Sequence, residues 1–140
     1  MRALGLDLGS KRIGVAVSDL SGSLASPLTT VHRSKSRRHD HATIADLVVD
    51  EEAEVVVVGL PLSLDGTLGP AARAATKEAD QLSSVVTVPV EMYDERFTTA
   101  TAERDLRELG LDARRQRSVV DKTAAAIMLQ AWLDHRGSAS

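Results

Sequence analysis

The segment from Leu4 to Asp19, LGLDLGSKRIGVAVSD, constrains the fold more than any other part of the chain. Large aliphatic residues alternate with small residues on both sides of a turn at Gly9 and Ser10. This alternation predicts two short strands joined by that turn. One face of the hairpin carries leucine, isoleucine and valine, and the other carries glycine, alanine and Asp7. The small face leaves room for a helix to approach the sheet closely.

Asp7 is the one charged residue on this small face, and it stands at the end of the first strand. A carboxylate in such a place costs free energy unless a cation meets it, which favours a functional site. In the alternative, Asp7 only starts the turn at Gly9 by accepting hydrogen bonds from backbone amides. The hairpin alone leaves both interpretations open.

Three further segments predict the other strands of one sheet. The run VVVVGL at Val55–Leu60 is typical of a parallel strand that is covered on both faces. The segment from Leu24 to Val31 contains Pro27, which cannot donate to a ladder, so this strand is expected at the edge. Val85 to Tyr93 predicts the last strand. The pattern indicates an α/β fold with helices on both faces of the sheet.

Helices are expected between and after these strands. The segment from Arg33 to His41 predicts a mobile basic loop, and Asp40 is expected to cap a helix with Ile44 facing the core. A second helix is expected to begin at Gly69 and Pro70 and to end near Ser84. A third is expected from Thr98 or Thr99 to Gly110. The last is expected to begin at Ser118, after a basic connector from Leu111 to Arg117.

Length and composition bound the class of protein. A chain of 140 residues predicts a single domain spanning 1–140, with 136–140 as a flexible tail. The absence of cysteine excludes a disulfide framework and a thiolate metal site. No apolar run reaches the length of a membrane span, and no signal-peptide pattern begins the sequence, so a cytoplasmic protein without a membrane partner is expected.

The charge distribution bears on whether the chain binds nucleic acid. A net charge of −3 argues against a globally basic surface, but more than half of the 17 basic residues lie in three clusters. Such clusters are either solvated loops or, if they lie beside candidate carboxylates, a phosphate-binding surface. With three aromatic residues, the chain has too few for a nonspecific base-stacking platform, so recognition by shape and phosphates is expected. The cations predicted to bind substrate are Lys11, Arg12, Arg96, Arg114, Arg115 and Arg117.

Acidic residues stand at the ends of several expected elements. Asp94 and Glu95 follow the last strand, and Asp121 opens the last helix on the stripe that Ala125 continues. A helix with this small face fits the small face of the hairpin, so Asp121 and Asp7 are expected to approach each other. In the alternative, these acids have structural roles: Asp7 and Asp94 as turn residues, and Asp121 in a capping box with Ser118.

Converging carboxylates repel one another and must share protons or metal ions. Oxygen ligands without cysteine or histidine favour Mg²⁺ or Mn²⁺, and two such ions clamp the attacking and leaving oxygens of a phosphodiester. The acids therefore predict metal-dependent hydrolysis of phosphodiester bonds.

Four motifs together resemble one known family. GLDLGSKRIGVAVSD, VVVVGLPLSLDGT, YDERFTTATAE and VVDKTAAAIMLQAWL occur in the order and spacing of the YqgF family, also called RuvX. This family contains nucleases with the ribonuclease H-like fold that are related to Holliday-junction resolvases. The resemblance implies a mixed five-stranded sheet in the order 3-2-1-4-5, with the first strand antiparallel to the second.

The resemblance also implies a site and a role. It assigns catalysis and metal binding to Asp7, Glu95 and Asp121, with Glu95 preferred to Asp94 as the second ligand. The implied role is processing of the 5′ end of pre-16S ribosomal RNA, and junction DNA is the alternative substrate. The implied partners are nucleic acid and ribosomal particles, and the chain would act as a monomer or homodimer.

Two other classes of function compete with the nuclease. An ATPase of the actin and sugar-kinase type shares the Asp-x-Gly-Ser turn but binds nucleotide between two copies of the fold, and 140 residues hold one copy. A catalytically silent module that binds nucleic acid or ribosomes would keep the acids for structure. Metal-dependent cleavage by the purified protein would exclude this silent module.

Overall fold

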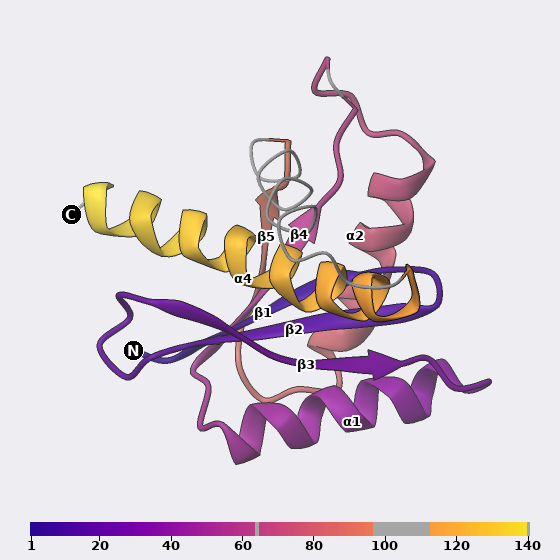
Figure 1. Ribbon diagram of the computed structural model, residues 1–140, viewed down its shortest axis with the longest axis horizontal. Coiled ribbons are helices and arrows are strands. Elements are labelled where there is room, and N and C mark those ends of the chain that lie inside the picture. Colours follow the sequence, from indigo (N-terminus) through magenta and orange to yellow (C-terminus); the bar gives the residue numbers. More distant parts are fainter. Residues whose placement is uncertain (64, 97–112, 140) are drawn as a thin grey trace.

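The computed structural model describes residues 1–63, 65–96 and 113–139, with the backbone alone at 113–121 and 137–139. Its strands form one mixed sheet in the order β3-β2-β1-β4-β5 (Figure 1). β1 is antiparallel to β2 and parallel to β4, which is parallel to β5. The predicted α/β fold and its strand order are confirmed. The strands are β1 Ala3–Leu8, β2 Arg12–Ser18, β3 Ala25–His32, β4 Val55–Leu60 and β5 Val90–Asp94.

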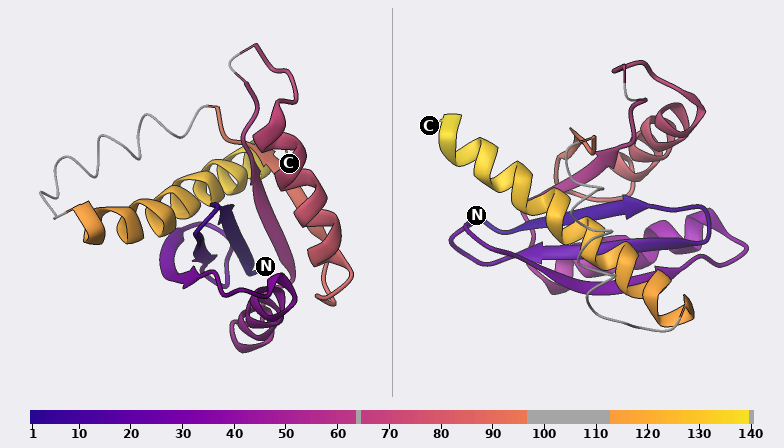
Figure 2. Two further views of the ribbon diagram at one scale, coloured as in Figure 1. Left: turned by 90° about the vertical axis from the view of Figure 1, so that its right-hand side faces the viewer. Right: turned by 45° about the horizontal axis from the view of Figure 1, so that its top comes forward.

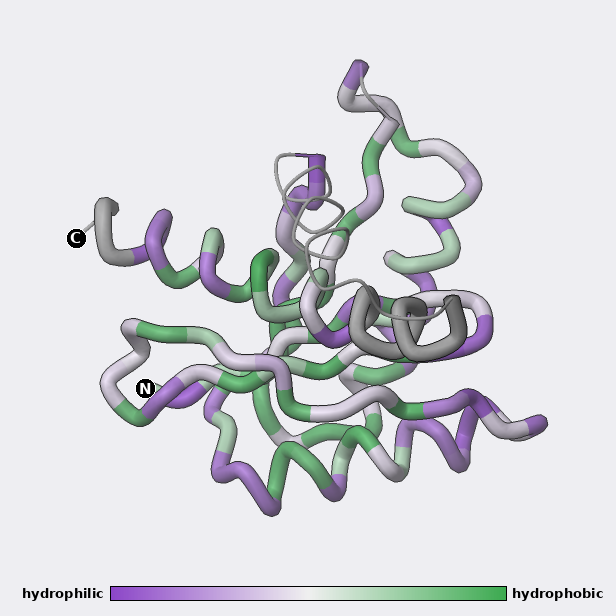
Figure 3. Tube along the Cα trace, in the orientation of Figure 1, coloured by the Kyte–Doolittle hydropathy of each residue, from purple (hydrophilic) through white to green (hydrophobic). Residues whose placement is uncertain are grey.

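Helices cover both faces of this sheet, as the sequence predicts. α1 (Arg37–Asp50) and α2 (Pro70–Ser83) lie on one face, and α4 (Ala113–Ala139) crosses the other (Figure 2). The large residues of the hairpin pack against α1 and α2, where Ile44 and Leu82 are buried. Apolar residues concentrate along the central strands between these layers (Figure 3).

The small face of the hairpin receives α4. A side-chain carbon added to Gly5 would lie 2.9 Å from the Cβ atom of Leu129 and 3.3 Å from the carbonyl oxygen of Ala125. Such a close approach requires a residue without a side chain on β1. The expected fit between the glycine and alanine face of the strands and the alanine face of the last helix is confirmed.

β3 lies at the edge of the sheet, beside β2, as Pro27 predicts. Pro27 stands opposite Ala16, next to an irregularity in the register between Val15 and Ala16. The missing amide hydrogen of proline is tolerated there because an edge strand has one unpaired side.

The start of α1 differs from the prediction. Ser36 is the N-cap and accepts a hydrogen bond from the amide of His39 at 3.1 Å, so the predicted cap at Asp40 is wrong. Asp40 is buried within the first turn and accepts a hydrogen bond from the amide of Ser34 at 2.9 Å. The loop after β3 is therefore shorter than predicted and is tied to the helix that follows it.

β5 begins at Val90, five residues later than predicted. The amides of Val85 and Val86 donate to the carbonyl oxygen of Leu82, so these residues close the end of α2. Val86 reaches the core from this turn without being part of a strand. Alternating valines predict strand, but here the turn after α2 uses them instead.

α4 is longer than predicted at both ends. It begins by Ala113, so the predicted connector is helical from that residue, and Asp121 does not open the helix. The expected tail is helical as far as Ala139. Alanine, arginine and glutamine are good helix formers, which explains the earlier start. The helix predicted after Thr98 or Thr99 lies outside the described residues.

No helix in the described ranges combines the length and the apolar character that a membrane span requires.

Candidate active site

Asp7 and Glu95 meet at the carboxyl ends of β1 and β5. The amide of Glu95 donates to the carbonyl oxygen of Leu60 at 3.1 Å, which fixes the chain just after β5. The Glu95 carboxylate then lies over Gly59 of β4, where a side chain on Gly59 would overlap it. From there it forms a hydrogen bond with Asp7. Glycine at position 59 is therefore required for the two acids to come together across the intervening strand.

The contact between the two acids changes their protonation. Burial, the negative charge of Asp7, the hydrogen bond with Asp7 and the charge of Asp94 together raise the pKa of Glu95 from 4.5 to about 8. Two carboxylates in contact are stable without a cation only if they share a proton. The pair therefore holds a proton at neutral pH.

Asp94 makes a different contact from Glu95. Its carboxylate accepts hydrogen bonds from the amide and the Nε atom of Arg96, at 2.9 Å and 2.8 Å, and Nη2 of Arg96 lies 2.6 Å away. The hydrogen bond from the Arg96 side chain holds the pKa of Asp94 below its usual value. Arg96 also faces Asp65 in the loop after β4, and the charge of Asp65 contributes to raising the pKa of Arg96. Of the two neighbouring acids, Glu95 contacts Asp7 and Asp94 is neutralised by Arg96.

The backbone of α4 brings Asp121 toward the same end of β1. Gly5 packs against Ala125 and Leu129, and α4 runs against the direction of β1 (Figure 1). Asp7 lies two residues beyond Gly5, about 6.6 Å along the strand. Asp121 lies one turn before Ala125, about 6 Å along the helix. Because α4 and β1 run in opposite directions, Asp7 and the backbone of Asp121 are displaced from this contact toward the same end of the sheet. The side chain of Asp121 lies outside the described residues.

Of the six predicted cations, Arg96 pairs with Asp94, and the other five fall into two groups. Lys11 is exposed in the β1–β2 turn, and Arg12 opens β2 opposite His32. Both therefore stand near the carboxyl end of β1, the end that carries Asp7. Arg114, Arg115 and Arg117 belong to the first turns of α4, where the structure describes the backbone alone.

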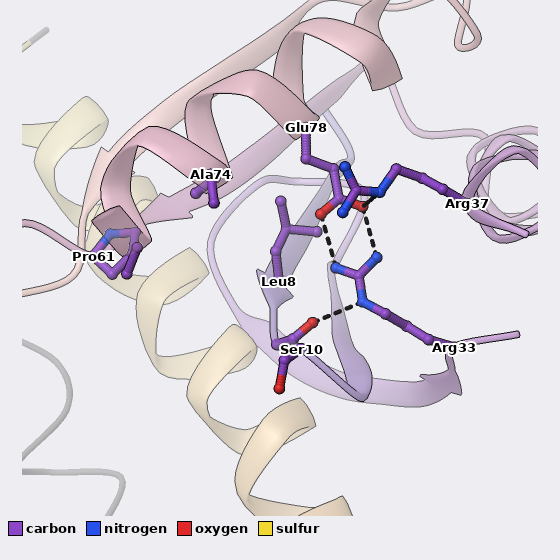
Figure 4. Close-up of a pocket in the computed structure, with 10 residues that line it drawn as sticks. Leu8, Ser10, Arg33, Arg37, Pro61, Ala74 and Glu78 are labelled. Carbon is purple, nitrogen blue, oxygen red and sulfur yellow. Dashed lines mark hydrogen bonds and ion pairs between the residues drawn. The ribbon is translucent and has the colours of Figure 1, made fainter. Parts of the chain in front are cut away.

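A buried ion-pair network supports the turn after Asp7 from the opposite face of the sheet (Figure 4). Arg33 donates from Nε to the carbonyl oxygen of Gly9 at 2.7 Å, and its two other nitrogens contact the Glu78 carboxylate at 2.8 Å each. His41 lies 2.7 Å from the same carboxylate. Burial alone would raise the pKa of Glu78, but the hydrogen bonds from Arg33 and His41 hold it below its usual value.

This network was not predicted from the sequence. Arg33 was expected in a mobile loop, and Glu78 drew no prediction of its own. A signal was present, because Glu78 shares a helical stripe with Ala75, Ala79 and Leu82, which are all buried. A charged residue within an apolar stripe needs a buried partner of opposite charge. The network borders a cavity of about 370 Å³, whose other lining residues include Leu8, Ser10, Arg37, Pro61 and Ala74.

The order and directions of the strands define a fold of the ribonuclease H-like class. A solved structure of Thermus thermophilus RuvC in complex with a Holliday junction substrate has this fold. It matches with a TM-score of 0.59 and 21% identity, over 98% of this chain and 96% of that one. At this identity the likeness shows the fold alone.

The sequence comparison narrows the class to one family. The model of the family described as "RuvX: Holliday junction resolvase" matches residues 1–135, and the chain belongs to this family. A relative from Mycobacterium ulcerans is 49% identical over 96% of this chain and 79% of its own length. One from Anaeromyxobacter dehalogenans is 50% identical over 97% of this chain and 98% of its own. Both bear the name "Putative pre-16S rRNA nuclease". The resemblance stated from the four motifs is confirmed.

Proposed function

We propose that this chain is a metal-dependent nuclease that hydrolyses phosphodiester bonds in structured nucleic acid. The observation that carries the proposal is the contact between the carboxylates of Asp7 and Glu95 at the carboxyl edge of the sheet. In an open α/β sheet this edge is where ligands bind. We also propose that residues 1–140 act as one nuclease domain.

The donor set fits a hard divalent cation. Asp7 and Glu95 offer carboxylate oxygens, the ligands that Mg²⁺ and Mn²⁺ prefer. The pKa of Glu95, raised by burial and by Asp7, indicates uncompensated negative charge that such a cation would neutralise. Within the described residues no three acids or histidines meet, and Asp121 would complete the set. Mg²⁺ or Mn²⁺ bound there, as one ion or two, supplies charge stabilisation for the transition state at phosphorus.

The residues of the chain have separate tasks in this proposal. Asp7, Glu95 and Asp121 would hold the cation, which would take the place of the proton shared by Asp7 and Glu95. Lys11 and Arg12 stand at the edge that carries Asp7, where they neutralise phosphates that flank the scissile bond. Arg96, held by Asp94, fixes the chain after Glu95. We assign Arg114, Arg115 and Arg117 to the backbone of the substrate on the basis of their charge and their place at the start of α4.

The substrate we favour is the 5′ region of pre-16S ribosomal RNA, met in the cytoplasm on ribosomal particles. The names of relatives about 50% identical over nearly the whole chain support this choice. A Holliday junction is the second candidate, which the description of the family favours. Both substrates are structured and highly charged, so the acid pair by itself suits either.

Cleavage of defined substrates tests the proposal. The purified protein would be incubated with Mg²⁺ or Mn²⁺ and one of three substrates: a pre-16S fragment, the matching mature fragment, or a four-way DNA junction. We expect cleavage of the precursor and its loss in Glu95→Gln. Glu91→Gln, an exposed change on the same strand, is the matched control and should retain activity. If no substrate is cleaved with either metal, the chain is a silent binding module.

Depletion of the protein in its host separates the two substrates. Accumulation of precursor 5′ ends in mapped ribosomal RNA would favour RNA processing. Unresolved recombination intermediates with normal ribosomal RNA ends would favour the junction.

A further inference from the structure

Two of the three aromatic residues of the chain line one small pocket between β5 and α4. Tyr93 comes from the strand and Trp132 from the helix, and Met92, His135 and Arg136 complete a lining around about 200 Å³. The rings of Tyr93 and His135 are edge to face, with their centroids 6.3 Å apart. The guanidinium carbon of Arg136 lies 5.1 Å from the centre of the Trp132 ring. The pocket therefore combines aromatic surfaces with a cation.

The residues that line the pocket differ in solvent exposure, which gives the pocket a buried floor and open walls. Trp132 is 7% exposed and belongs to the core beneath α4, so it forms the floor. Tyr93 is partly buried, and His135 and Arg136 are exposed, so they form walls that solvent reaches. A ligand can enter without disturbing the core.

Tyr93 and Trp132 line the pocket from the face of the sheet that carries the acid pair, and Met92 lines it from the opposite face. Tyr93 packs against the core under α4 and stands in register with Gly59 of β4. The Glu95 carboxylate lies over that same Gly59. Neighbouring strands are about 4.8 Å apart, so Tyr93 is one strand spacing from the position that the Glu95 carboxylate covers. A group stacked on Tyr93 would therefore lie beside the strand position that the Glu95 carboxylate covers.

We propose that this pocket binds one unpaired nucleobase of the substrate strand, next to the scissile phosphate. The inference rests on the proposed nuclease function and adds a specificity-determining site to it. Unpaired bases stack on aromatic rings and on guanidinium planes, and both surfaces are present here. The volume is below the roughly 300 Å³ at which pockets for drug-sized ligands begin, so it holds one ring system and excludes a base pair. The nuclease therefore prefers a strand that is locally unpaired at its cleavage site.

The single tryptophan of the chain reports occupancy directly, without any need for cleavage. Trp132 fluorescence would be titrated in Ca²⁺ with a single-stranded oligoadenylate of ten nucleotides, and separately with an abasic oligomer of equal length and charge. We expect the oligoadenylate to change the emission and to bind about tenfold more tightly than the abasic oligomer, as stacking of one base predicts. Equal responses to the two oligomers, or no response to either, would overturn the inference.

Three variants link the signal to the pocket. Tyr93→Phe keeps the ring and should bind like the wild type, whereas Tyr93→Ala should lose most of the difference between the two oligomers. His135→Ala changes an exposed residue, so it tests the pocket without risk to the fold, and it should weaken binding of the oligoadenylate several-fold. His39→Ala, an exposed histidine on α1, is the control. If Tyr93→Ala and His135→Ala bind both oligomers like the wild type, the base binds elsewhere and the inference is wrong.

Cleavage assays keep this inference separate from the nuclease proposal. In His135→Ala the KM for a substrate unpaired at the cleavage site should rise several-fold while kcat stays near wild type. If the enzyme is active but neither its KM nor its fluorescence depends on the base, the base-binding role of the pocket is refuted and the nuclease proposal stands. A base-dependent signal in a protein that cleaves nothing would support the pocket and overturn the nuclease.

Discussion

Replacing Glu95 by glutamine should remove a specific pH dependence of stability. In the metal-free protein the pKa of Glu95 is raised to about 8, mainly by burial and by the charge of Asp7, from an ordinary value of 4.5. The folded state keeps this proton between pH 4.5 and about 8, whereas the unfolded chain loses it near 4.5. The stabilising contribution is therefore complete below pH 4.5 and is lost as the pH rises toward 8. Glutamine has the same shape and no proton to lose.

The size of the effect follows from the linkage of one proton. Each pH unit inside this window changes the free energy of unfolding by about 1.4 kcal/mol. Between pH 5.5 and pH 7.5 the metal-free wild type should lose up to about 3 kcal/mol relative to Glu95→Gln. At roughly 2 to 4 °C of Tm per kcal/mol for a domain of this size, the difference in Tm should change by about 6 to 12 °C.

Urea and thermal denaturation in EDTA at the two pH values would measure this difference. Glu91→Gln, the exposed change on the same strand, should follow the wild type at both pH values. Addition of Mg²⁺ at pH 7.5 should stabilise the wild type and leave Glu95→Gln nearly unchanged, because a ligand that binds the folded state raises its stability. Parallel stability profiles for Glu95→Gln and the wild type would refute the shared proton.

Three further changes test parts of the site and its support. Glu78→Ala should lower the free energy of unfolding by about 3 to 5 kcal/mol, since it removes the buried anion of the network and leaves the partly buried Arg33 guanidinium without its partner, and a urea titration showing less than about 1 kcal/mol would contradict this. Gly59→Ala should push the Glu95 carboxylate away from its place and reduce metal-dependent cleavage at least tenfold, as steady-state assays would measure. Its Tm should change little, because a flexible side chain can move aside. Gly5→Ala should cost roughly 1 to 3 kcal/mol in thermal denaturation by forcing α4 outward, and unchanged stability would show that the contact is looser than described.

The fold was largely predictable because its pattern is local. A few residues are enough to predict each strand's surroundings. Alternation predicts the two-faced hairpin, the valine run predicts the covered strand Val55–Leu60, and proline predicts the edge strand. Helix ends were less predictable. Ser36 and Asp40 are both good caps, and the backbone used the earlier one while Asp40 turned inward.

The acids of the candidate site stand out in the sequence, but their contacts do not. Asp94 and Glu95 are neighbours in the sequence. Only the fold shows that Asp94 pairs with Arg96, while the Glu95 carboxylate lies over Gly59. The pocket of Tyr93 and Trp132 escaped prediction for a similar reason. These residues are far apart in the sequence and meet only when α4 crosses the sheet.

The central claim is that Asp7, Glu95 and Asp121 act through their charge on a divalent ion, and Asp121→Asn tests it most directly. Asparagine keeps the shape and one oxygen of aspartate but gives up the anion that holds the ion. The variant should melt near the wild-type temperature in EDTA, yet its cleavage with Mg²⁺ or Mn²⁺ should fall about a hundredfold or more. Asp7→Asn should lose cleavage to a similar extent, and the double variant should be scarcely less active than either single one, because residues that act as a unit are not additive. If Asp121→Asn cleaves as fast as the wild type with either metal, Asp121 is no ligand and the proposed triad is wrong.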